Sequence, residues 1–167
     1  GRTTLMGEGL QHQDGHSLLL ASTVPACQAY DPAFAYEVAT IIRHGIDKMY
    51  GASPADIFYY VTLYNENLVM PARPAHVSDA DIINGLYRWR AAEGNARAAI
   101  LFSGTSYGAA IEAADILRDV HGIDVELWSA TSYKSLRDDA MEVERWNRLH
   151  PSQPGRTSII ERTIGAS

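Results

Sequence analysis

The feature that most constrains the fold is a strand–helix–strand pattern in residues 96–130. An apolar, β-rich run at 96–102 is followed by a helical stripe of apolar side chains at 106–121, and Gly122 ends that stripe. A second β-rich run then occupies 123–130. About 35 residues is the length of a right-handed βαβ unit, in which the two strands are parallel. The sequence therefore predicts an α/β fold with a parallel sheet, doubly wound rather than closed into a barrel.

Helix and strand patterns also alternate in the rest of the chain. The best-marked helix spans 31–51, where Asp31 is a suitable N-cap, Pro32 suits the first turn and Gly51 can end the helix. Residues 57–64 are apolar and rich in aromatic side chains, which is typical of a buried strand. Similar reasoning predicts helices at 78–90 and 132–150, and strands at 17–25 and 157–164.

Residues 71–79, with the sequence PARPAHVSD, separate two parts of the chain. They contain two prolines and show no apolar periodicity, as expected of a linker. We therefore expect one domain to comprise residues 1–72 and a second to comprise residues 73–167. The chain starts without methionine and ends soon after a new apolar segment begins, so we expect it to be a fragment of a longer polypeptide.

Composition excludes several classes of protein. Of the 167 residues, 46% are hydrophobic and 20% charged, so a packed core is expected. The net charge of −6 argues against nucleic-acid binding, which needs a basic patch. No apolar run approaches the roughly 20 residues that span a bilayer, so no membrane association is expected. The single cysteine, Cys27, fits a reducing compartment, and we expect a cytoplasmic protein.

The segment GEGLQHQDGHS at residues 7–17 concentrates titratable groups where glycines disfavour a helix. It holds Glu8, His12, Asp14 and His16 just before a predicted strand. A hydrogen-bonded surface turn explains these residues as well as an active-site loop in which His12 contacts a substrate oxygen. A metal site built from the four side chains, as in a metal-dependent hydrolase, is a third alternative, but their spacing matches no standard motif.

Four stretches of the chain carry a resemblance to a known family. They are GRTTLMGEGLQHQDGHSLLLAS, YDPAFAYEVA, YNENLVMP and ERWNRLHP, in this order. The chain resembles the homodimeric, thiamine diphosphate-dependent pyruvate dehydrogenases of bacteria over nearly its whole length and, more distantly, transketolase. The resemblance implies a transketolase-like α/β fragment: residues 1–72 would be the end of the pyrimidine-binding domain, and 73–167 the first part of the C-terminal domain.

The resemblance also implies a reaction and its partners. Enzymes of this family decarboxylate pyruvate with thiamine diphosphate and magnesium, and pass the acetyl unit to a lipoyl group. Expected partners are therefore pyruvate, the lipoyl domain and core of the dihydrolipoyl acetyltransferase component, and a second copy in a homodimer. A related dehydrogenase acting on 2-oxobutyrate, or a noncatalytic assembly fragment, would share these motifs.

Site roles also follow from the resemblance. His12 would hydrogen-bond the substrate carboxylate or a developing oxyanion, and Glu8 would be a neighbouring active-centre carboxylate. His16 would support the site or assist proton transfer, whereas Asp14 would shape the turn. The family's Gly-Asp-Gly magnesium motif is absent from the chain, and its cofactor-activating glutamate would lie upstream. We therefore expect no cofactor-binding or metal-ligating residue here, and no activity from the isolated chain.

Overall fold

The computed structural model describes residues 14–64 and 67–165 of the chain. Its elements, in chain order, are α1 (Ser17–Ser22), β1 (Cys27–Tyr30), α2 (Ala35–Tyr50), β2 (Phe58–Val61), α3 (Asp79–Asn84), β3 (Tyr87–Arg90), β4 (Ala98–Phe102), the short 3₁₀ helix η3 (Gly104–Ser106), α4 (Tyr107–His121), β5 (Val125–Ser129), α5 (Tyr133–Leu149) and α6 (Ile159–Thr163).

Two sheets organise the described residues. Strands β1 and β2 form a parallel pair, joined by α2. The second sheet has the order β3–β5–β4, in which β4 and β5 are parallel and β3 runs antiparallel to β5. The predicted βαβ unit is therefore confirmed as β4–α4–β5. The expected α/β class is also confirmed, although the strands form two small sheets rather than one doubly wound sheet.

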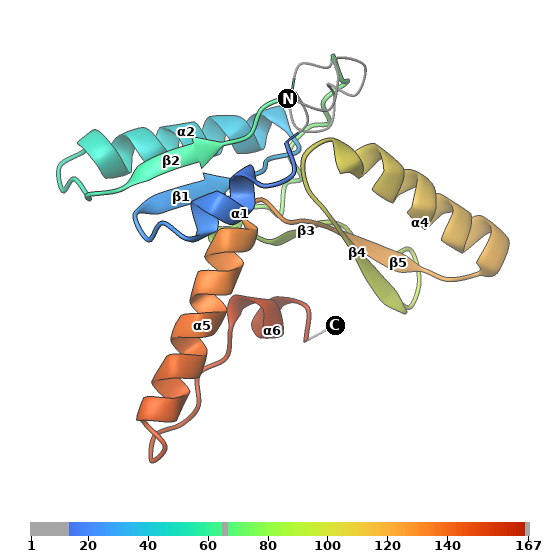
Figure 1. The fold of residues 1–167 in the computed structure, drawn as a ribbon. Helices are drawn as coiled ribbons and strands as arrows, with labels where there is room; N and C mark the ends of the chain where they lie inside the picture. Colours follow the sequence, from blue (N-terminus) through green and yellow to red (C-terminus); the bar gives the residue numbers. More distant parts are fainter. Residues whose placement is uncertain (1–13, 65–66, 166–167) are drawn as a thin grey trace.

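The helices divide the molecule into two lobes and a projecting arm (Figure 1). In one lobe α2 packs against β2, while α1 lies against β1. In the other lobe α4 covers β4 and β5. Helix α5 starts beside β1 and then extends away from the body, with α6 packed against it. Since β1 and β5 end close to each other, the two lobes meet at the carboxyl ends of their strands.

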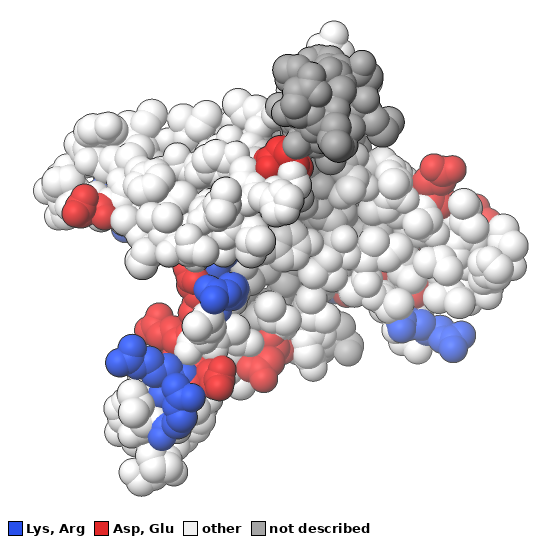
Figure 2. Space-filling view, viewed as in Figure 1, with Lys and Arg blue, Asp and Glu red and all other residues white. Residues whose placement is uncertain are grey.

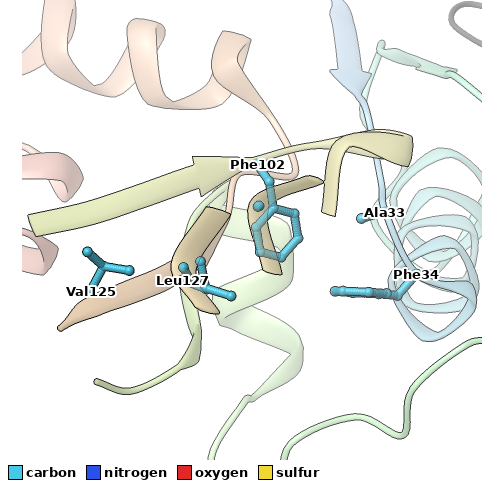
Figure 3. Packing of buried hydrophobic residues seen from close by; sticks show 7 residues of the cluster. Ala33, Phe34, Phe102, Val125 and Leu127 are labelled. Atoms are coloured by element: carbon cyan, nitrogen blue, oxygen red, sulfur yellow. The ribbon is translucent and has the colours of Figure 1, made fainter. Parts of the chain in front are cut away.

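The main hydrophobic core joins the two lobes. Phe34, which lies just before α2 and is 0% exposed, packs among residues of the second lobe. Its ring lies 5.8 Å from that of Phe102 on β4 and 5.5 Å from that of Trp89 on β3. Figure 3 shows Phe34 directed toward Phe102, with Leu127 of β5 on the far side. Burial of one aromatic ring in the opposite lobe ties the lobes into one packed body.

Two predicted strands are wrong, because local capping decides both segments. Residues 17–25 contain the helix α1, and the carboxylate of Asp14 accepts hydrogen bonds from the backbone N–H groups of His16 and Ser17 at its start. Residues 157–164 contain the helix α6, in which Ser158 and Glu161 form a reciprocal capping box. Both segments carry apolar runs that also suit strands, so composition alone does not separate the two outcomes.

Three further boundaries differ from expectation. The helix predicted at 78–90 ends at Asn84, because Gly85 adopts a left-handed φ of 101° and the chain then enters β3. The helix predicted from Asp31 begins at Ala35 instead. The strand predicted at 57–64 is limited to β2 and is half exposed, with Phe58 49% accessible. Among the described residues, no helix has the length and apolar character to cross a membrane.

Candidate functional site

Only the end of the candidate loop lies within the described residues. Glu8 and His12 fall outside them, so their predicted roles remain predictions. Asp14 accepts hydrogen bonds from the backbone N–H groups of His16, at 3.1 Å, and Ser17, at 2.9 Å. Its second carboxylate oxygen accepts a hydrogen bond from the Ser17 hydroxyl. Asp14 therefore holds the turn that leads into α1, in agreement with the role expected for it.

His16 stands at the N-cap position of α1 with an exposed side chain. Its backbone participates in the Asp14 turn, and its imidazole is accessible to solvent. Within residues 14–64 and 67–165, no three His, Cys, Asp or Glu side chains converge in a way that could hold a metal ion.

A pocket of about 320 Å³ opens beside the end of this loop. It lies between α1 and the first turns of α5, and Gly15 forms part of its wall. Leu18 and Leu19 supply apolar surface, and the charged lining residues are Asp31, Lys134 and Arg137. Both basic side chains pair with Asp138, at 2.5 Å and 3.5 Å. The end of the candidate loop thus borders a cleft rather than a packed interior, as a substrate-contacting loop requires.

A buried carboxylate, Asp31, fastens the two lobes where their strands end. Its side chain accepts hydrogen bonds from the hydroxyls of Thr62 and Tyr64, which follow β2, and from Ser103 Oγ at 2.8 Å, which follows β4. Its backbone N–H donates to the carbonyl of Thr131 at 2.8 Å. The prediction of Asp31 as a helix N-cap is therefore wrong, because the carboxylate serves contacts with residues far along the chain.

Glu37 replaces Asp31 as the residue that caps α2. Its carboxylate accepts hydrogen bonds from the backbone N–H groups of Ala33, at 2.6 Å, and Phe34, at 3.0 Å. It also accepts from the Tyr87 hydroxyl, at 2.5 Å, and from Ser129 Oγ, at 2.6 Å, both in the second lobe. Burial raises the pKa of the Glu37 carboxyl, although these hydrogen bonds act in the opposite direction.

Sequence reasoning missed Glu37, although a signal was present. A carboxylate at the third position of an otherwise apolar helix start is typical of a residue that turns back to the helix N-terminus. The second set of donors, from residues 50 and 92 positions away, could not be read from local sequence. Asp31 and Glu37 are structural groups of the lobe junction rather than parts of the candidate loop.

Two further histidines and the single cysteine have packed or hydrogen-bonded surroundings. The His44 ring hydrogen-bonds the Tyr59 hydroxyl at 2.8 Å, and burial lowers the pKa of its imidazole. His150 stacks on Trp146 with ring centroids 4.6 Å apart. Cys27 is buried, and burial raises the pKa of its thiol, so the thiol is poorly suited to nucleophilic chemistry.

Two family models together cover most of the chain. Residues 1–71 match the "Pyruvate dehydrogenase E1 component middle domain", and residues 85–166 match the "Transketolase-like TK C-terminal domain". Among solved structures, transketolase from Pichia stipitis superposes with a TM-score of 0.64 at 19% identity, over 81% of this chain and 18% of that chain. This structural likeness supports the fold alone.

Curated relatives are more similar in sequence. The pyruvate dehydrogenase E1 component of Pseudomonas aeruginosa is 49% identical over 99% of this chain, and that of Mycolicibacterium smegmatis is 47% identical over 98%. The corresponding protein of Escherichia coli K12 is 42% identical over 98%. The chain spans about a fifth of the length of these relatives, 18–19% in each case. Over nearly its whole length, the chain is therefore similar to one part of the pyruvate dehydrogenase E1 component.

Proposed function

We propose that this chain is part of a thiamine diphosphate-dependent pyruvate dehydrogenase. The full-length enzyme decarboxylates pyruvate and transfers the acetyl unit to the lipoyl group of a dihydrolipoyl acetyltransferase component. The observation that carries the proposal is the 42–49% identity to pyruvate dehydrogenase E1 components over 98–99% of the chain. Similarity of this extent covers the candidate loop as well as the core.

Within that enzyme, we assign His12 to the substrate. Its imidazole donates a hydrogen bond to a substrate carboxylate or to an oxygen that gains negative charge during the reaction. Glu8 is a neighbouring carboxylate of the active centre, and His16 supports the site from the base of the loop. The exposed position of His16 and the pocket beside Gly15 support this assignment, because both leave the end of the loop open to a ligand.

The cofactors are assigned to other parts of the full-length enzyme. The chain spans only 18–19% of the length of its relatives, and it lacks the Gly-Asp-Gly sequence with which this family holds magnesium. The residues that line the pocket beside Gly15 include a single carboxylate, Asp31, whose oxygens already accept hydrogen bonds from Thr62, Tyr64 and Ser103, so this pocket does not fit a magnesium ion. We therefore propose that the 167-residue chain alone does not turn over pyruvate, because its cofactor is held by polypeptide outside this chain.

The lobe of α2, β1 and β2 supports an assembly role. On the face shown in Figure 2, charged side chains gather along α5 but are sparse over this lobe. The same lobe has exposed large apolar side chains, including Ile46 (56%), Tyr50 (79%) and Phe58 (49%). Exposed apolar surface of this kind marks protein contacts. We propose that the rest of a cytoplasmic homodimer covers it, and that a domain boundary falls near residue 72.

A turnover assay tests the proposal directly. The full-length protein and the 167-residue chain are each supplied with thiamine diphosphate, magnesium and pyruvate, and the release of carbon dioxide is measured. We expect turnover only in the full-length protein, with His12→Ala lowering kcat on the order of 10²-fold and leaving cofactor affinity unchanged. His121→Ala, at the exposed end of α4, is the matched control and should change neither quantity.

Three results would contradict the proposal. Turnover by the 167-residue chain would show that the essential groups are present in it. A large loss of cofactor affinity in His12→Ala would move His12 from the substrate to the cofactor. Faster turnover of 2-oxobutyrate than of pyruvate would identify the related 2-oxoacid dehydrogenase instead.

A further inference from the structure

Helix α2 carries a row of apolar side chains on the side that faces away from the core. Its members are three or four positions apart, so they share one face of the helix. They are Ala35, Ala39, Ile42, Ile46 and Tyr50, and all five are exposed. The three largest, Ile42, Ile46 and Tyr50, are 48%, 56% and 79% accessible. The solvent side of a helix is ordinarily polar, so this row, here called the α2 stripe, is suited to cover by protein.

The two elements that pack against α2, β2 and α3, lie on other sides of the helix. Ile41 is fully buried, and a Cβ atom at Gly45 would lie 3.2 Å from the Tyr59 ring of β2, so this side meets the sheet. Arg43 pairs with Asp79 of α3. Figure 1 shows α2 beside β2, at the edge of its lobe. The α2 stripe is therefore a surface separate from both contacts.

The outer side of α4 gives a direct comparison. It also has exposed apolar residues at helical spacing, namely Ala109, Ala113, Ile116 and Val120. Ile116 has Glu112 one turn before it and Asp119 one turn after it, so carboxylates border that row. One turn from Ile42, in contrast, the residues on either side are Val38, Ala39, Gly45 and Ile46. Of these two helix faces, the α2 stripe is therefore the one better suited to a dry contact.

The α2 stripe runs from small side chains to large ones. Ala35 and Ala39 lie in its amino-terminal half, Ile46 and Tyr50 lie in its carboxyl-terminal half, and Ile42 lies between them. Two copies packed antiparallel about a two-fold axis near Ile42 bring Ala39 of each copy opposite Ile46 of the other, and Ala35 opposite Tyr50. Small side chains opposite large ones allow packed helices to approach to about 8–10 Å without leaving voids. The stripe is thus complementary in shape to itself.

We propose that α2 packs against α2 of a second copy through this stripe in the full-length protein. The inference rests on the proposed function, because it names one contact of the homodimer proposed above. Self-complementarity favours a second copy over an unrelated segment of the enzyme, whose shape would bear no relation to that of the stripe. A two-fold contact also forms each pairing twice, so every change in the stripe acts on the dimer twice.

Crosslinking of engineered cysteines in the full-length protein tests the contact. Ile42→Cys places a thiol near the two-fold axis, and Ile116→Cys on α4 is the matched control, because the two isoleucines are 48% and 49% exposed. Each variant is treated with a bismaleimide that spans about 10 Å, the separation of packed helices, and is run on a denaturing gel beside the unsubstituted protein. We expect a covalent dimer from Ile42→Cys. Ile116→Cys should give no more dimer than the unsubstituted protein.

Exchanging the sizes of two side chains tests the antiparallel pairing. Ala39→Ile places isoleucine opposite isoleucine, and Ile46→Ala places alanine opposite alanine. The first change overfills the contact and the second leaves a void, so each should raise the dimer dissociation constant about tenfold in sedimentation experiments. The double variant again places alanine opposite isoleucine, and its dissociation constant should return to within about threefold of the original.

Four results would overturn the inference. Ready labelling of the Ile42→Cys thiol by a monofunctional maleimide, without a covalent dimer, would show an open surface. A thiol that is protected from labelling but forms no dimer would show that the same subunit covers the stripe. A double variant as weak as the two single variants combined would exclude the antiparallel pairing. The fourth result is a monomeric full-length protein, which would also remove the proposed homodimer; turnover of pyruvate is measured independently and decides the proposed reaction.

Discussion

Replacing Phe34 by alanine should test whether the two lobes share one core. The ring is 0% exposed and contacts three aromatic rings of the second lobe, at centroid distances of 5.1 Å (Tyr107), 5.5 Å (Trp89) and 5.8 Å (Phe102). A fully buried Phe→Ala substitution costs about 3–5 kcal/mol in unfolding free energy, through lost burial and the cavity that remains. That cost is a large share of the roughly 5–15 kcal/mol available to a domain.

The assay is chemical denaturation of the 167-residue chain, followed by far-ultraviolet ellipticity and tryptophan fluorescence. Trp89 packs against Phe34, so fluorescence reports on the second lobe although the substitution lies in the first. We expect both signals to shift together toward lower denaturant concentration. Phe58→Ala is the matched control. The Phe58 ring is 49% exposed, so this substitution should lower the unfolding free energy by less than about 1 kcal/mol.

Phe34→Leu covers the case in which the alanine variant does not fold. Leucine keeps most of the apolar volume and loses the ring contacts, so the expected cost is about 1–2 kcal/mol. The shared-core interpretation is refuted if Phe34→Ala costs no more than Phe58→Ala. It is also refuted if ellipticity shifts while the fluorescence transition stays in place, because the lobes would then unfold independently.

Two further predictions concern the buried carboxylates of the junction. Burial raises the pKa of Glu37, so the folded state retains the carboxyl proton to higher pH than the unfolded state does. The unfolding free energy should therefore fall as the pH rises above the ordinary pKa of a glutamate, 4.5. Glu37→Gln should flatten this pH dependence, which is measured by urea denaturation at a series of pH values. Asp31→Ala removes the acceptor that the hydroxyls of Thr62, Tyr64 and Ser103 share, and should cost about 2–3 kcal/mol by denaturation, whereas Asp56→Ala, at an exposed position, should cost less than about 0.5 kcal/mol. A pH dependence unchanged by Glu37→Gln, or equal costs for the two aspartates, would contradict these roles.

Elements with a clear local signal were predictable from sequence. The β4–α4–β5 unit combines β-rich runs with a helical stripe, and Gly122 ends the helix with a left-handed φ of 63°. Helices α1 and α6 were predicted as strands because both segments contain apolar runs. In the structure, hydrogen bonds of Asp14 and Ser158 at the helix starts favour the helix instead. Local pattern is thus informative where many residues agree, and weak where one hydrogen bond decides.

The candidate site was less accessible to such reasoning. The residues of the loop are compatible with a surface turn or a ligand-contacting segment, and only family resemblance favoured His12. The roles of Asp31 and Glu37 depend on Ser103 and Ser129, which are 72 and 92 positions away along the chain. Contacts at such separations are set by how the lobes pack, and the periodicity of a single segment contains no information about them.

The close approach of Tyr64 to Gly104 limits how this family can vary. Gly104 has a φ of 53°, and a Cβ atom there would collide with the Tyr64 hydroxyl, which itself donates to Asp31. A relative with any larger residue at the position of Gly104 must therefore shorten the side chain opposite or move the β2 exit. Substitutions at these two sites, 40 positions apart in sequence, should therefore covary across species.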